Sequence, residues 1–172
     1  FVEGYKAITV TRCSPNLGAE IGNIDLTRPL TDLELSELKR AFTDNLVLFF
    51  RDQKISFEDH VRLAEYFGST GTHAGKKTHS TESHDPRVRK FHFDEKSKEI
   101  SGNAWHTDQS CAAIPPLGSI LYMHTVPPNG GGDTLFVSMY AAYEALSDRM
   151  KSYLEGLTAL HDGVLIFGDG TP

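Results

Sequence analysis

Residues 105–108 read Trp-His-Thr-Asp, so an imidazole stands two residues before a carboxylate. In an extended segment the side chains at positions i and i+2 point to the same face, so His106 and Asp108 can converge on one ion. One histidine and one carboxylate supply two corners of the facial triad that leaves open coordination positions on iron. A His-x-Asp tripeptide also arises often by chance, and a surface pair without a metal is the alternative. The surrounding sequence has to decide between them.

Several short blocks accompany this tetrapeptide in a fixed order. Those after it are PPLG at 115–118, GGDTL at 131–135, AAYEALS at 141–147, Gly-Leu at 156–157 and His-Asp at 161–162. Those before it are GAEI at 18–21, DLTRPL at 25–30 and FFRDQ at 49–53. Taken together, the blocks resemble the taurine/2-oxoglutarate dioxygenase (TauD/TfdA-like) family of non-haem iron oxygenases over nearly the whole chain.

The resemblance implies a mostly β fold with flanking helices, built on a double-stranded β-helix (jelly-roll) core that is incomplete in this chain. Residues 1–172 would form the N-terminal portion of a single dioxygenase domain. The implied cofactors are Fe(II), 2-oxoglutarate as cosubstrate and dioxygen. The implied reaction is hydroxylation of a small anionic substrate (a sulfonate, sulfate ester or carboxylate), with succinate and CO2 as products.

Three residues acquire roles in the cofactor site through the resemblance. His106 and Asp108 match the first two iron ligands of the family and are the expected catalytic pair. Thr134 matches a threonine whose hydroxyl helps to hold the distal carboxylate of 2-oxoglutarate; its structural alternative is a β-branched residue that starts a strand. Trp105 matches an aromatic residue beside the metal strand, and core packing is its expected role.

Four residues are candidates for substrate contacts: His73, Lys76, Asn103 and Phe167. His73 stands at the position of a family histidine that binds the sulfonate, and a solvated loop histidine is the equal alternative. Lys76 replaces a family tyrosine, and Gly102 replaces an asparagine, with Asn103 beside it. These departures argue against taurine itself as the substrate. Lys76, Lys77 and His79 form a different candidate anion clamp, whose alternative is a solvated lid.

The distal half of the family's catalytic set does not match any residue of this chain. The second histidine ligand and the arginine that pairs with 2-oxoglutarate normally lie beyond the position of Pro172. His161 matches a different, upstream block and is not assigned as the third ligand. The non-Met start and the end at Pro172 therefore lead us to expect a fragment of a longer enzyme.

Composition limits the remaining function classes. The chain has 172 residues and a net charge of −6, which argues against a nucleic-acid-binding protein. No apolar run approaches the roughly 20 residues that span a bilayer. The two cysteines, Cys13 and Cys111, are expected to be free thiols in a reducing cytoplasm. The expected partner is a small-molecule substrate, and the sequence does not decide whether the chain forms a homo-oligomer.

Hydrophobic periodicity and capping residues predict the local structure. Strands are expected at 7–10, at 46–50 (buried on both faces), at 118–126 and at 134–137. Helices are expected after Thr31, after Ser56 and after Ser147, each of which is a good N-cap, and at 140–146. The long polar stretch at 69–104 predicts an active-site lid.

Two other functional interpretations stay open at this point. One is a non-catalytic jelly-roll binding module whose His106–Asp108 pair is vestigial, which the missing distal ligands favour. The other is a zinc-dependent hydrolase, which needs a further histidine, cysteine or carboxylate on the metal. Succinate formation separates the dioxygenase from the binding module, and activity without oxygen would indicate the hydrolase.

Overall fold

The computed structural model describes residues 2–71, 80–81, 87–97, 102 and 104–164. The chain divides into two compact units. The first comprises Phe1–Asp59 and Tyr122–Thr158, and the second comprises His60–Leu121 and Ala159–Pro172. Within the described ranges, no helix combines the length and apolar character that crossing a membrane requires.

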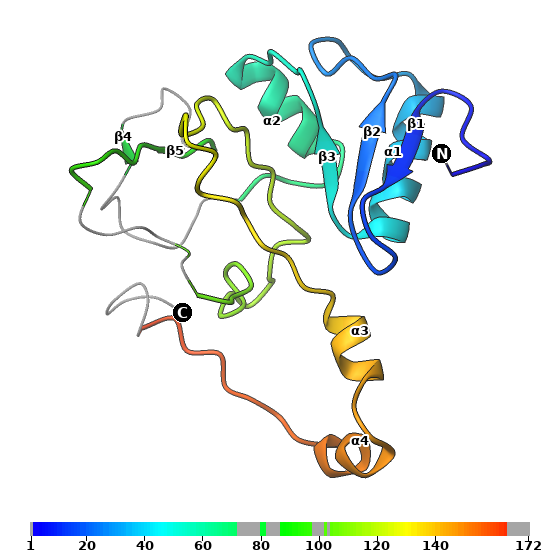
Figure 1. Cartoon of the computed structure of the whole chain (residues 1–172), viewed down its shortest axis with the longest axis vertical. Coiled ribbons are helices and arrows are strands. Elements are labelled where there is room, and N and C mark those ends of the chain that lie inside the picture. The colour runs from blue at the N-terminus through cyan, green and yellow to red at the C-terminus, as the bar shows by residue number, and fades with distance from the viewer. Residues whose placement is uncertain (1, 72–79, 82–86, 98–101, 103, 165–172) are drawn as a thin grey trace. The chain divides into compact units, whose positions relative to one another are not determined.

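A three-stranded sheet and one helix build the core of the first unit. Strands β1 (Thr9–Arg12) and β2 (Ala19–Gly22) pair antiparallel, and β3 (Leu48–Phe50) pairs parallel to β2, which lies in the centre. Helix α1 (Asp32–Asn45) connects β2 to β3 and covers one face of the sheet (Figure 1). The core between them consists of Ile8, Val10, Ala19, Ile21 and Ala41.

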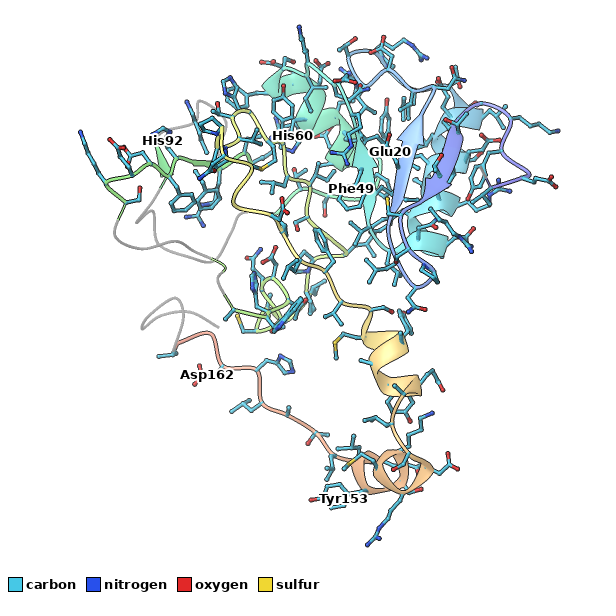
Figure 2. All side chains as sticks on the ribbon, viewed as in Figure 1. Glu20, Phe49, His60, His92, Tyr153 and Asp162 are labelled. Carbon is cyan, nitrogen blue, oxygen red and sulfur yellow. The ribbon has the colours of Figure 1, made fainter. Side chains whose placement is uncertain are left out.

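Strand β3 lies within the predicted range 46–50, but its side chains are only half-buried, so the prediction of burial on both faces was wrong. Within the described sheet β3 is an edge strand, and its two faces differ. Leu48 and Phe50 pack against the core. Phe49 (labelled in Figure 2) meets Phe136 edge-on, with ring centroids 6.1 Å apart.

The start of α1 is fixed by a reciprocal capping box, as its sequence predicts. Thr31 Oγ1 accepts a hydrogen bond from the Glu34 backbone N–H at 3.3 Å, and Glu34 Oε2 accepts one from the Thr31 N–H at 2.8 Å. The buried Glu34 carboxylate also accepts hydrogen bonds from both terminal nitrogens of Arg28, with donor–acceptor distances of 2.6 and 3.0 Å. These bonds, the Arg28 pair first, lower the pKa of Glu34 to about 2.

Acid should therefore weaken the fold through Glu34. A carboxyl whose pKa is lower in the folded than in the unfolded chain contributes stability above its ordinary pKa of 4.5, and that contribution disappears as the pH falls from 4.5 towards 2. Because Arg28 is half-exposed, we expect Glu34→Gln to cost about 1–2 kcal/mol of unfolding free energy at pH 6. Urea unfolding at pH 6 and pH 3 should show that more than half of this difference is lost at pH 3; an equal difference at both would contradict it.

A second buried carboxylate of α1 holds the segment that precedes β1. Glu37 Oε1 accepts the Lys6 N–H at 2.7 Å, and Oε2 accepts the N–H groups of Ala7 and Ile8 at 2.9 and 3.1 Å. Burial opposes ionisation of Glu37, but these three donors outweigh it and hold the pKa of the carboxyl below its ordinary value. Glu37 thus satisfies backbone donors that lie about thirty residues earlier in the chain.

Helix α2 (Phe57–Glu65) starts at the predicted cap. Ser56 and Asp59 exchange backbone-to-side-chain hydrogen bonds of 2.9 and 3.1 Å, which is again a capping box. In the second unit, strands β4 (Ser80–Thr81) and β5 (Lys90–Phe91) form a short antiparallel pair. The remaining described part of that unit is largely irregular (Figure 1).

The last two helices agree with the prediction. Helix α3 (Met139–Glu144) begins after the N-cap Ser138, and α4 (Asp148–Leu154) begins after the N-cap Ser147. Each serine hydroxyl accepts a hydrogen bond from the backbone N–H three residues later. Neither short helix contains a buried residue, so capping rather than packing defines their ends.

The strands expected at 118–126 and 134–137 are absent from these described residues, so this prediction was wrong. A strand requires a hydrogen-bonded neighbour, and no strand in the described part of the chain pairs with either segment. The large apolar side chains that suggested strands remain exposed, from 36% at Tyr122 to 72% at Leu135.

Candidate metal centre

The side chains of His106 and Asp108 lie together in the second unit. His106 Nε2 is 3.3 Å from Asp108 Oδ1, and the two side chains are 54% and 47% exposed. The pair is therefore accessible to a solute ion. Its atoms are one imidazole nitrogen and one carboxylate oxygen, both of which bind divalent transition metals.

The other ring nitrogen of His106 has a partner of its own. His106 Nδ1 lies 2.8 Å from the carbonyl oxygen of Ala104. Because a carbonyl oxygen only accepts, this bond requires the ring proton on Nδ1. In the neutral imidazole the Nε2 lone pair is then free to bind a metal. A backbone carbonyl on the non-ligating nitrogen is a common support for metal-bound histidine.

The spacing of the two atoms fits a shared metal ion. The same separation also suits an ion pair in which a protonated His106 donates its Nε2–H to Asp108. With Nε2 deprotonated, the lone pair and the carboxylate oxygen face each other, and a metal cation between them would offset their repulsion. Metal–ligand bonds of about 2.1 Å place adjacent atoms of an octahedral ion roughly 3 Å apart, close to the observed separation. Among the described residues, no group of three or more histidine, cysteine or acidic side chains is arranged to hold a metal. A metal ion held by this pair alone would keep open coordination positions.

The backbone of this pair is not a strand, so the extended segment that the sequence argument assumed was wrong. Residues 105–107 are irregular, and a turn begins at Asp108. Gln109 has a φ of +49°, and its carbonyl accepts the Ala112 N–H at 3.0 Å. Neither the Ala104 carbonyl contact nor the Gln109 conformation was predictable from the sequence.

The other predicted site residues fall into two groups. Thr134 belongs to the first unit and is exposed in an irregular segment. His73, Lys76, Asn103 and Phe167, and with them Lys77 and His79, lie outside the described residues. Trp105 is 67% exposed, so the expectation that it packs in a core was wrong in this chain. Cys13 and Cys111 are free thiols, as predicted.

A family model described as "Taurine catabolism dioxygenase TauD, TfdA family" matches residues 9–165, which is most of the chain. The chain belongs to this family. Since the match includes the His106–Asp108 segment, the pair lies inside the region that defines family membership.

Curated relatives agree with this membership. The chain is 32% identical to an alpha-ketoglutarate-dependent 2,4-dichlorophenoxyacetate dioxygenase of Cupriavidus pinatubonensis, over 86% of this chain and 55% of that protein. It is 30% identical to an alkylsulfatase of Acinetobacter baylyi, over 95% of this chain and 50% of that protein.

A solved structure gives the same result for the fold. The crystal structure of a taurine dioxygenase from Burkholderia xenovorans superimposes with a TM-score of 0.69 at 29% identity, over 88% of this chain and 52% of that chain. The TauD/TfdA chain described here spans about half the length of the relatives it matches.

Proposed function

We propose that this TauD/TfdA chain forms the N-terminal portion of an Fe(II)- and 2-oxoglutarate-dependent dioxygenase. The observation that carries the proposal is the His106–Asp108 pair, with a metal-compatible 3.3 Å separation and the Ala104 carbonyl on Nδ1. The exposed pair leaves room for a further ligand, a cosubstrate and dioxygen on the same ion.

Each residue has a defined part in this proposal. His106 Nε2 and Asp108 Oδ1 hold the iron, and Ala104 keeps the imidazole in the ligating tautomer. The Thr134 hydroxyl donates a hydrogen bond to the distal carboxylate of 2-oxoglutarate. The iron supplies the oxidation, in which dioxygen, 2-oxoglutarate and a substrate C–H give succinate, CO2 and an alcohol. The chain's own contribution is binding, orientation and exclusion of water.

The substrate in this proposal is a small anion. Relatives named for a sulfonate, an alkyl sulfate and an aryloxyacetate share an acidic group and little else, which supports an anionic substrate rather than one compound. His73, Lys76, Asn103 and Phe167 are the proposed substrate contacts, and residues 69–104 the proposed lid. The basic side chains would bind the acidic group, and Phe167 the apolar body.

The jelly-roll core is likewise a proposal for the full-length protein. Residues 121–123 and again 135–137 are runs of three exposed apolar side chains, which is the pattern of a strand with both faces to cover. Relatives about twice as long contain enough further chain to pair with both segments. We therefore propose that the apolar side chains of these two segments are buried in the full-length protein.

Oxygen-dependent succinate formation tests the reaction. The full-length protein with Fe(II), 2-oxoglutarate and ascorbate should form succinate in air, and a short alkanesulfonate, an alkyl sulfate and an aryloxyacetate should be compared as substrates. At least one is expected to raise the rate clearly above the substrate-free rate, and none should do so anaerobically. Succinate at the substrate-free rate with all three anions would contradict an anionic substrate.

A non-catalytic binding module is the second candidate. The absence of a three-residue metal group among the described residues favours it. Such a module would bind the anion but form no succinate under any condition. Calorimetric binding of the same anions, measured beside the succinate assay, therefore separates the two functions.

A further inference from the structure

The half-buried residue after the candidate metal pair adopts an unusual backbone conformation. Gln109 has a φ of +49°, in the left-handed region that glycine, asparagine and aspartate favour and that most residues avoid. Strained backbone of this kind persists only where the surrounding structure holds it, and it occurs often at functional sites.

The hydrogen bonds and exposure around Gln109 indicate what the strain does. Residues 104–108 are exposed, whereas residues 109–112 are half-buried. The Gln109 carbonyl accepts the Ala112 N–H at 3.0 Å, which closes a turn directly after Asp108. Gln109 thus lies between the exposed His106–Asp108 pair and the half-buried turn at 109–112.

A strand ladder would normally set the direction of such a pair, but residues 105–108 have none. Two local features of the backbone take its place. The Ala104 carbonyl fixes His106 from the N-terminal side. The left-handed φ of Gln109 sets the direction in which the chain leaves Asp108.

We propose that Gln109 is a positioning residue whose left-handed backbone conformation holds the Asp108 carboxylate against His106 Nε2 for metal binding. The proposal rests on the proposed function, because it takes the pair to be a metal site. It concerns the backbone of Gln109 and assigns no role to the amide side chain.

Three substitutions at Gln109 separate the effect of its backbone conformation from the effect of its side chain. Gln109→Gly removes the amide but adopts the left-handed conformation freely, and Gln109→Asn tolerates it. Gln109→Val disfavours it strongly, because valine is β-branched. The matched control is Asp52→Val in the first unit, where Asp52 has a φ of +56°. This control imposes similar strain away from the metal pair.

Co(II) titration of the full-length protein, followed by visible absorption, measures the effect. Gln109→Val should weaken Co(II) binding about tenfold, which is the typical effect of losing a contact that supports a metal ligand. The Gln109→Gly and Gln109→Asn variants should bind Co(II) with nearly the affinity of the wild-type protein. Asp52→Val should lower the melting temperature without changing Co(II) affinity. An unchanged Co(II) affinity in Gln109→Val would overturn the inference, and so would an equal loss of Co(II) affinity in Gln109→Val and Gln109→Gly. If His106→Ala binds Co(II) as well as wild type does, the metal site itself fails, and both proposals fall together.

Discussion

Replacing His106 with alanine is expected to lower iron-dependent succinate formation by the full-length protein at least about 100-fold, since disturbing a contact that only supports a metal ligand already costs 10–100-fold. The imidazole is one of the two proposed metal ligands that lie together in the described part of the chain. In the proposed site, its loss would remove the bond to the metal and also the lone pair that the Ala104 carbonyl orients. Asp108→Ala should have an effect of similar size.

His124→Ala is the matched control for this loss. His124 is also an exposed histidine, and its Nδ1 lies 2.9 Å from the hydroxyl of the adjacent Thr125. Because it has no part in the proposed site, its replacement should leave succinate formation within about twofold of wild type. Comparable losses in both variants would mean that His106 acts only through general stability.

Glu37→Ala is expected to destabilise the first unit strongly. The substitution leaves the N–H groups of Lys6, Ala7 and Ile8 without their acceptor, and an orphaned buried donor costs about 1–3 kcal/mol. Since one of the three is fully buried and two are partly buried, we expect a loss of about 3 kcal/mol. The melting temperature should fall by on the order of 10 °C.

Glu37→Gln and Glu3→Ala are the controls for that measurement. Glutamine keeps one side-chain oxygen and should recover part of the stability, whereas Glu3 is an exposed acid in the same N-terminal segment and should matter little. Differential scanning calorimetry of the three variants checks the order. A Glu37→Ala melting temperature equal to that of Glu3→Ala would refute the anchoring role of Glu37.

Local sequence signals predicted the helices well. The Thr31–Glu34, Ser56–Asp59 and Ser147 caps lie within three residues of their partners, so the sequence contains both halves of each interaction. The side chains of His106 and Asp108 lie together as expected, 3.3 Å apart, but on irregular backbone rather than on the extended segment that the i, i+2 argument assumed. Their role as iron ligands stays a prediction.

Interactions between distant residues were not predictable in the same way. Strand β2 (Ala19–Gly22) contains a glycine and has a weak pattern, and it exists because β1 and β3 pair with it on both sides. In the sequence Glu37 resembles an ordinary acidic residue on a helix surface, and only the structure shows that it accepts hydrogen bonds from the backbone of residues 6–8. Segments 118–126 and 134–137 show the converse, because their strand pattern is clear but the described residues provide no partner.

The conformation of Gln109 could not be read from the sequence either. Glutamine is not a residue type that favours a positive φ, so only the observed backbone reveals the turn after Asp108. The identity of the distal ligands is a different case, because no residue of this chain carries a signal for them.

The most direct test of the iron and 2-oxoglutarate site is an anaerobic titration of the full-length protein with Fe(II) and 2-oxoglutarate. We expect a visible metal-to-ligand charge-transfer band that saturates with both components and that is absent from His106→Ala. A missing band in the wild-type protein, or an equal band in His106→Ala, would contradict the account.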